Sequence, residues 1–237
     1  MPESRSDNCA SIARRLLPPS CVLCSADATR DGLCGGCRRA LPRLPDVTCA
    51  VCAVPVPAAA GQVCGRCLQK APRYAHAAAA LEYAFPVDSL VQRLKYAADL
   101  TCARPLAAAL ANAIEHEPYP DLVIAMPIAR QRLAERGFNQ AAEIARLACS
   151  EFGLTLKTGV ARRERAGTPQ ASLPWKERAK NVRGVFACDA DLSGMTVAVV
   201  DDVMTTGATL DELAGVLRRA GAKSVTGWIC ARTVVRG

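Results

Sequence analysis

Aromatic residues are scarce in this sequence, and long apolar runs are absent from it. Phe, Trp and Tyr make up 4% of the 237 residues. The most apolar stretch, Pro105–Ile114, is far shorter than the roughly twenty residues that a membrane-spanning helix needs. The first residues alternate charged and polar side chains and lack the apolar centre of a secretion signal. We therefore expect a cytoplasmic protein without a membrane span.

Histidine is also rare, whereas basic residues are in excess. The two histidines, His76 and His116, stand outside any spacing of metal ligands, which argues against an open catalytic zinc site. The chain has 30 lysines and arginines against 22 acidic residues, a formal net charge of +8. Such an excess favours anionic partners, either phosphates or nucleic acid.

Cysteine, by contrast, is abundant. Eight of the 13 cysteines form four C-x-x-C pairs: Cys21 and Cys24, Cys34 and Cys37, Cys49 and Cys52, Cys64 and Cys67. Cytoplasmic thiols stay reduced, and two such pairs complete one tetrahedral site of four thiolates, so the pattern predicts two structural zinc ions. The spacing permits a local pairing (21/24/34/37 and 49/52/64/67) or a crossed pairing (21/24/49/52 and 34/37/64/67). An iron–sulfur cluster is the less favoured alternative.

Composition divides the chain into three parts. Residues 1–19 form a polar, helix-prone tail. Residues 20–72 hold every C-x-x-C pair but few large apolar residues. This part therefore needs a metal for stability and is predicted to be a double zinc ribbon. Residues 73–237 alternate apolar strands with amphipathic helices, which predicts an α/β domain with a doubly wound, mostly parallel sheet.

Apolar periodicity gives the expected elements of this α/β domain. Strands are expected at 75–83, 121–126, 196–200 and 224–230. Helices are expected at 88–96, 105–115, 139–152 and 210–220. The basic segment 162–183 contains two prolines and is predicted to be a long loop.

The segment 197–209, V-A-V-V-D-D-V-M-T-T-G-A-T, joins an apolar strand to a helix. The strand carries Asp201 and Asp202 to the carboxyl edge of the sheet, where open α/β sheets bind their ligands. Gly207 permits a sharp turn close to an anion, and the following helix offers free N–H groups. A phosphate beside two carboxylates suits a phosphorylated sugar, because the sugar hydroxyls need acceptors.

This segment closely resembles the phosphoribosyl-pyrophosphate (PRPP) motif of type I phosphoribosyltransferases, which has four apolar residues, two acids, two variable positions and T-T-G-x-T. The resemblance implies that Asp201 and Asp202 act as catalytic residues, that they bind the ribose hydroxyls, and that Mg²⁺ accompanies PRPP. It also implies a set of residues around the 5′-phosphate: Val203, Met204, Thr205, Thr206, Gly207, Ala208 and Thr209. The turn that holds pyrophosphate corresponds to 125–130, with Pro127 and Arg130 as contacts. The alternative for its arginines is a solvated helix face.

The loop 162–184 lies where type I enzymes keep a flexible lid over PRPP. This correspondence gives five candidate lid residues: Arg162, Arg163, Gln170, Lys176 and Arg178. A single aromatic, Trp175, among lysines and arginines is equally typical of a surface for single-stranded nucleic acid. Both interpretations remain open.

Four motifs together resemble the ComF family of phosphoribosyltransferase-like proteins, which includes members linked to competence for DNA uptake. They are L-K-Y-A-A-D (94–99), R-G-F-N-Q-A (136–141), P-Q-A-S-L with N-V-R-G (169–184), and the PRPP loop. The similarity covers nearly the whole chain, including the cysteine-rich segment.

Two functions follow as hypotheses. The first is an enzyme that transfers phosphoribosyl from PRPP to an unidentified acceptor, a glycosyl transfer associated with DNA uptake or nucleotide salvage. The second is a non-catalytic protein that senses PRPP or binds single-stranded DNA. The expected partners are PRPP, single-stranded DNA or a nucleobase, and proteins of the competence machinery. No segment is recognisable as a hood over a nucleobase, so the sequence does not identify the acceptor.

Overall fold

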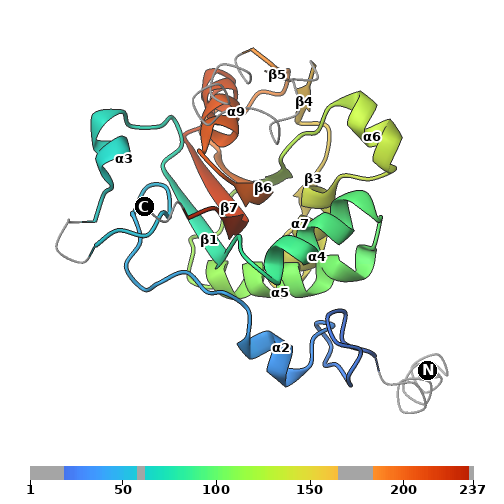
Figure 1. Ribbon diagram of the computed structural model, residues 1–237. Coiled ribbons are helices and arrows are strands. Elements are labelled where there is room, and N and C mark those ends of the chain that lie inside the picture. Colours follow the sequence, from blue (N-terminus) through green and yellow to red (C-terminus); the bar gives the residue numbers. More distant parts are fainter. Residues whose placement is uncertain (1–18, 58–61, 165–183, 235–237) are drawn as a thin grey trace, which may run out of the picture. The chain divides into compact units, whose positions relative to one another are not determined.

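A parallel sheet of five strands forms the centre of the larger part of the molecule (Figure 1). The computed structural model describes residues 19–57, 62–164 and 184–234. The chain divides into two compact units, Met1–Leu41 and Pro42–Gly237. The first unit contains the short helix α2 (Gly35–Arg39) and the first two C-x-x-C pairs. The second unit contains the sheet together with the other two pairs.

The strands lie in the order β1-β7-β6-β2-β3, and every pairing between them is parallel. Their bounds are β1 His76–Glu82, β2 Leu122–Ala125, β3 Leu156–Lys157, β6 Thr196–Met204 and β7 Ser224–Arg232. In the central strand β6, four consecutive apolar side chains from Val197 to Val200 are buried. A strand that is covered on both faces reads as such a continuous apolar run. The predicted parallel, doubly wound sheet is therefore confirmed.

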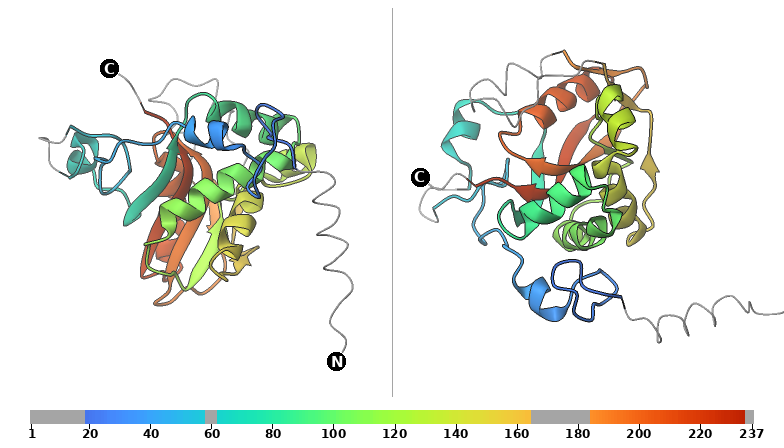
Figure 2. Two further views of the ribbon diagram at one scale, coloured as in Figure 1. Left: turned by 90° about the horizontal axis from the view of Figure 1, so that it is seen from below. Right: turned by 45° about the vertical axis from the view of Figure 1, so that its right-hand side comes forward.

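Helices cover both faces of this sheet (Figure 2). On one face lie α5 (Ala103–Ile114) and α7 (Gln140–Ser150), with α4 (Val87–Tyr96) and the short 3-10 helix η2 (Leu100–Cys102) beside α5. On the other face lies α9 (Ala208–Arg219), which packs against β7. Because α7 follows β2 and α9 follows β6, the chain leaves these neighbouring strands toward opposite faces. The carboxyl ends of β2 and β6 thus form the crevice where ligands of such sheets bind.

Several short elements were not expected from the sequence. They are α3 (Gly65–Gln69), α6 (Arg130–Arg136), β3, and the antiparallel pair formed by β4 (Ala161–Arg163) and β5 (Phe186–Cys188). Arg162 and Arg163 lie in β4, so the prediction of a loop from residue 162 onward was wrong at its start. Strand β6 also extends to Met204, because its partner β7 continues alongside it as far as Arg232.

None of the helices in the described residues has both the length and the apolar character that a bilayer crossing requires.

The turn after α9 supplies a test of the packing. Gly221 has a φ of +101°, and a Cβ there would lie 2.9 Å from the backbone of Ser193. We expect Gly221→Ala to lower the free energy of unfolding by about 3 kcal/mol, because it adds a backbone clash to an unfavourable conformation. Gly153→Ala is the matched control: it has a φ of +65° with open space around the new Cβ, and should cost about 1 kcal/mol. Urea denaturation followed by circular dichroism measures both, and equal losses would contradict the packing described.

Candidate functional site

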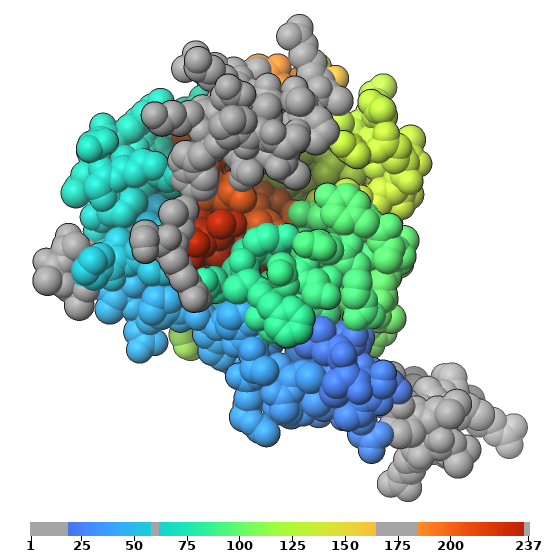
Figure 3. Space-filling model, viewed as in Figure 1, coloured from blue at the N-terminus to red at the C-terminus, as the bar shows by residue number. Residues whose placement is uncertain are grey.

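The acidic pair lies near the carboxyl end of the central strand β6. Asp201 and Asp202 are consecutive in the strand, so their side chains leave it toward opposite faces. Asp202 is buried and Asp201 is half-buried. Figure 3 shows surface from the last third of the chain, orange to red, set back between the green surface around α4 and the teal surface around α3. The last part of the chain, which contains β6 and β7, therefore contributes to a recessed surface.

An ion pair with Lys95 balances one carboxylate of this acidic pair. The ammonium of Lys95, at the end of α4, contacts the carboxylate of Asp202, and the amide of Gln140 donates to the same carboxylate at 3.4 Å. Burial opposes ionisation of Asp202, but these two contacts hold its pKa below the ordinary value. Burial and the neighbouring charge of Asp202 raise the pKa of Asp201 well above its ordinary value. The two carboxyl groups are thus electrostatically unequal.

Two sequence motifs converge on this ion pair. In R-G-F-N-Q-A, Gly137 ends α6 in the left-handed conformation, and Asn139 caps α7 while donating to the carbonyl of Met126 at 3.0 Å. The next residue of the motif, Gln140, consequently reaches Asp202. From L-K-Y-A-A-D, the ring of Tyr96 lies 5.7 Å beneath the guanidinium of Arg136. Lys95 of L-K-Y-A-A-D and Gln140 of R-G-F-N-Q-A thus both contact the carboxylate of Asp202.

The loop after β6 turns sharply into helix α9. Gly207 has a φ of +79°, and a Cβ there would lie 2.6 Å from Met204 Cε and 3.0 Å from the hydroxyl of Tyr74. The Thr206 hydroxyl accepts from the N–H of Ala208 at 3.1 Å. A cavity of about 300 Å³ opens beside the loop, with basic side chains on its wall. Its lining consists of Arg66, Cys67, Lys70, Ala71, Pro72, Tyr74, Thr206, Gly207, Ala208 and Asp211. Basic groups beside a helix N-terminus suit an anion.

The turn after β2 lies next to β4. Pro127 is half-buried in this turn, whereas Arg130 is exposed as the first residue of α6. A β-bridge joins Ala129 to Arg163, whose guanidinium lies 5.6 Å from the centre of the Phe186 ring. Arg162 forms ion pairs with Glu164 and Asp189. The other three candidate lid residues, Gln170, Lys176 and Arg178, lie outside the described residues.

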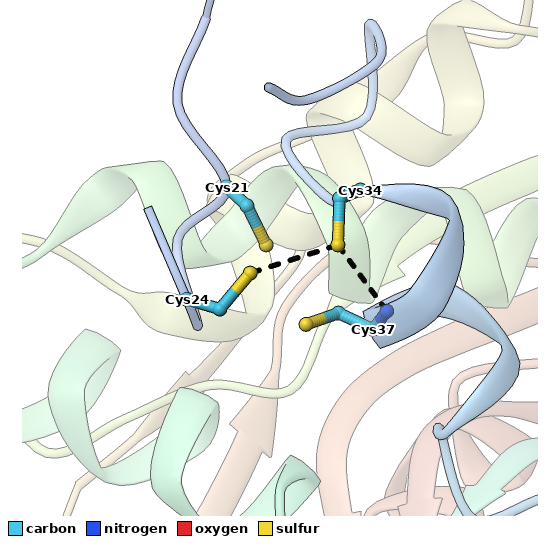
Figure 4. A group of neighbouring side chains, drawn as sticks. All are labelled: Cys21, Cys24, Cys34 and Cys37. Carbon is cyan, nitrogen blue, oxygen red and sulfur yellow. Dashed lines mark hydrogen bonds between the residues drawn. The ribbon is translucent and has the colours of Figure 1, made fainter. Parts of the chain in front are cut away.

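The eight paired cysteines form two groups of four, each within one compact unit. In the first four-cysteine group the Sγ atoms of Cys24 and Cys34 lie 3.6 Å apart, and the Cys34 sulfur accepts from the N–H of Cys37 (Figure 4). The second four-cysteine group consists of Cys49, Cys52, Cys64 and Cys67. There the Sγ atoms of Cys52 and Cys64 lie 3.7 Å apart. The pairing is therefore local rather than crossed.

Both groups fit zinc. A tetrahedral ion with Zn–S bonds of about 2.3 Å separates its sulfur ligands by about 3.8 Å, close to the two distances above. The second group differs from the first in its surroundings, because three of its cysteines belong to the same hydrophobic core as the sheet: Cys49, Cys52 and Cys67. The cysteine-rich segment has few large apolar residues and was expected to depend on a metal for its stability. Its second half also shares the core of the larger unit.

Four residues of this region received no individual role from the sequence: Lys95, Gln140, Tyr74 and Arg232. Lys95 and Gln140 lie within motifs that carried the family resemblance, and their place in those motifs could have marked them as candidate site residues. Tyr74 and Arg232 had no comparable signal, because their contacts join segments that are far apart in the chain.

Comparison with known proteins agrees with this architecture. A double zinc ribbon model matches residues 12–68 and a phosphoribosyl transferase model matches residues 133–235. DNA utilization protein YhgH of Salmonella typhi is 31% identical over 233 residues, which cover 92% of this chain and 99% of that protein. Competence protein F of Haemophilus influenzae is 29% identical over 223 residues, with coverages of 90% and 96%. The structure of a purine phosphoribosyltransferase from Pyrococcus horikoshii is 22% identical, with a TM-score of 0.32 and coverages of 54% and 80%. The predicted double zinc ribbon and phosphoribosyltransferase-type domain are confirmed.

The ion pair of Lys95 gives a prediction about stability. In Lys95→Met the carboxylate of Asp202 loses its cation, so we expect a loss of about 3 kcal/mol in the free energy of unfolding at pH 7. The wild-type pair stabilises the fold above the ordinary pKa of an aspartate, and this contribution disappears as the pH falls through the depressed pKa of Asp202. The difference between variant and wild type should therefore shrink below about pH 5.

Denaturation of both proteins in urea at a series of pH values measures this difference. Lys157→Met, which removes an exposed lysine from β3, controls for the loss of a positive charge. A loss for Lys95→Met that stays constant from pH 7 down to about pH 2, well below the ordinary pKa of an aspartate, would show that the ion pair is not its cause.

Proposed function

Because this chain belongs to the ComF family, we propose that it binds PRPP with Mg²⁺ at the carboxyl ends of β2 and β6. The observation that carries the proposal is the acidic pair at the end of β6, whose buried member Asp202 is ion-paired with Lys95, placed before a glycine turn and a helix N-terminus. Carboxylates accept hydrogen bonds from ribose hydroxyls, and the loop from Val203 to Thr209 offers N–H and hydroxyl donors to the 5′-phosphate. One site thus supplies both the acceptors and the donors that a phosphorylated ribose needs.

The diphosphate of PRPP is assigned to the turn after β2. Pro127 and Arg130 lie in or beside this turn, and the bridge from Ala129 brings Arg163 next to it. Guanidinium groups suit diphosphate oxygens because their paired N–H donors match two oxygens at once. Bound Mg²⁺ would neutralise charge on the diphosphate, and oxygen ligands such as carboxylates and phosphates fit this ion.

The reaction that we propose is phosphoribosyl transfer. The bond from C1 of the ribose to the diphosphate breaks, and a bond from C1 to an acceptor atom forms as the acceptor loses a proton. Positive charge develops on the sugar during this step, and the carboxylates that would bind the ribose hydroxyls favour this charge. The protein contributes position and electrostatic stabilisation rather than a covalent intermediate. This makes the chain a glycosyltransferase of the pentosyl class, with an acceptor that the described residues do not identify.

Calorimetry with PRPP and MgCl₂ tests the binding site. We expect wild type to bind, and Asp201→Asn with Asp202→Asn to bind at least about 100-fold more weakly, since two charged hydrogen-bond acceptors are lost. Asp46→Asn removes a carboxylate from an exposed position and serves as the control. Equal affinity of the double variant and wild type would overturn the assignment of Asp201 and Asp202.

Release of pyrophosphate separates an enzyme from a sensor. Wild type is incubated with PRPP, Mg²⁺ and a series of nucleobases and small amines, and the double variant at Asp201 and Asp202 gives the background. An acceptor that raises release above this background supports transfer. Binding of PRPP without release for any acceptor would favour a protein that senses PRPP.

A second candidate function is the binding of single-stranded DNA. It is favoured by the formal net charge of +8 and by relatives that are named for DNA utilization and competence. Fluorescence anisotropy with a labelled oligonucleotide should show affinity that falls steeply between about 50 and 200 mM salt, because bound phosphates release counterions. Affinity that is absent at low salt, or independent of salt, would contradict this function.

A further inference from the structure

Arg232, the last residue of β7, is a buried cation that the proposed function does not use. The residue is 1% exposed. Its described hydrogen bonds go to four backbone carbonyl oxygens, those of Cys52, Met204, Thr205 and Thr233. A buried guanidinium is costly unless its donors are satisfied, so these carbonyls have to stay in place around it.

Three of the four carbonyls come from two candidate functional regions. Nε donates to Cys52 of the second four-cysteine group at 2.9 Å. Nη1 donates to the carbonyl of Met204 at 3.0 Å and also to that of Thr205. Both residues lie in the loop from Val203 to Thr209, which is called the phosphate loop below. The planar fork of arginine fixes the angle between these donors. One side chain thus holds the second four-cysteine group and the phosphate loop in a fixed relation.

The bonds of Arg232 also bear on which way the loop amides point: the Met204 carbonyl accepts from Arg232 and from the N–H of Thr233 at 3.1 Å, whereas the Thr205 carbonyl accepts from Arg232. In a trans peptide the carbonyl and the following N–H point in opposite directions. Because the carbonyls of Met204 and Thr205 face Arg232, the N–H groups of Thr205 and Thr206 face away from it. An anion-binding loop needs its N–H groups free on the ligand side, and a cation behind the loop secures this orientation.

Two further contacts connect the same regions. Tyr74, which follows the second four-cysteine group in the chain, lies beneath Gly207 of the loop. Its neighbour Arg73 binds Asp211 in the first turn of α9 through both its backbone N–H and its guanidinium, at 2.6 to 3.2 Å. The sheet also contacts the turn between Cys49 and Cys52, because the N–H of Ala77 in β1 donates to the carbonyl of Val51 at 3.0 Å. The second four-cysteine group is therefore fixed to β1, α9 and the loop.

We propose that Arg232 is a positioning residue that couples the second four-cysteine group to the phosphate loop. Zinc in this group would then set the ligand-binding geometry of the loop. Zinc holds the turn from Cys49 to Cys52, and with it the Cys52 carbonyl, in one place. Four thiolates around a divalent ion also leave a net negative charge, which balances the buried guanidinium. Without zinc the carbonyl moves, Arg232 loses a partner, and the loop amides lose their fixed orientation. This inference rests on the proposed binding of PRPP.

Three variants test the coupling. Arg232→Lys keeps the charge but loses the fork. Cys64→Ser removes a ligand of the second group, and Cys24→Ser makes the same change in the first group, within the other compact unit. For each protein we would measure zinc per chain by metal analysis, hydrogen exchange of residues 203–209 without ligand, and affinity for PRPP with Mg²⁺ by calorimetry. Exchange in α7, buried against the sheet, reports whether the fold is retained.

Arg232→Lys should keep both zinc ions, exchange faster at 203–209 and bind PRPP about tenfold more weakly, a loss of the order of one charged hydrogen bond. Cys64→Ser should lose one zinc and show the same two changes. Cys24→Ser should lose one zinc and leave loop exchange and affinity unchanged.

The inference is overturned if Cys64→Ser loses zinc while loop exchange and affinity match wild type, or if Cys24→Ser alters the loop as strongly. A wild type that holds two zinc ions and does not bind PRPP would refute the proposed function instead. In that case the exchange of residues 203–209 still decides whether the second four-cysteine group controls the loop.

Discussion

The ion pair between Lys95 and Asp202 is the constraint on which the candidate site depends. The acidic pair proposed to bind a sugar lies at least half buried, yet burial drives carboxyl groups toward their neutral form. Lys95 favours the ionised form of Asp202, while burial and the neighbouring charge raise the pKa of Asp201. The site is thus held ready with one charged carboxylate and one that ionises less easily. A ligand that carries Mg²⁺ would bring the positive charge needed for both.

This constraint explains why segments far apart in the chain carry short polar motifs. Lys95 comes from the end of α4, Gln140 from the start of α7, and Asp202 from the centre of the sheet. Each motif contains residues that aim one polar group: Gly137 and Asn139 fix the start of α7, and Tyr96 contacts Arg136. The segments that contain Lys95, Gln140 and Asp202 therefore contribute to one electrostatic site rather than to separate ones.

The sequence was sufficient for the features that local chemistry determines. The parallel sheet, the main helices, the glycine turn at Gly207 and the ligand type of the C-x-x-C pairs could all be predicted, because each follows from periodicity, turn chemistry or thiol spacing. Strands of two or three residues such as β3 and β4 have no measurable periodicity, and they exist only through their pairing partners. The pairing of the thiols and the contacts of Arg232 also depend on long-range packing, so the sequence left the first open and gave no indication of the second.

The two groups of four cysteines offer the same ligands but differ in what they can influence. The first belongs to the smaller of the two compact units. The second shares a hydrophobic core with the sheet and offers the Cys52 carbonyl to Arg232. A carbonyl that is fixed by a metal-bound turn is a more rigid partner than one in an ordinary loop. Under the proposed function this loop leaves its amides free for a phosphate, so its rigidity would come from its carbonyl side, which Arg232 and the N–H of Thr233 contact.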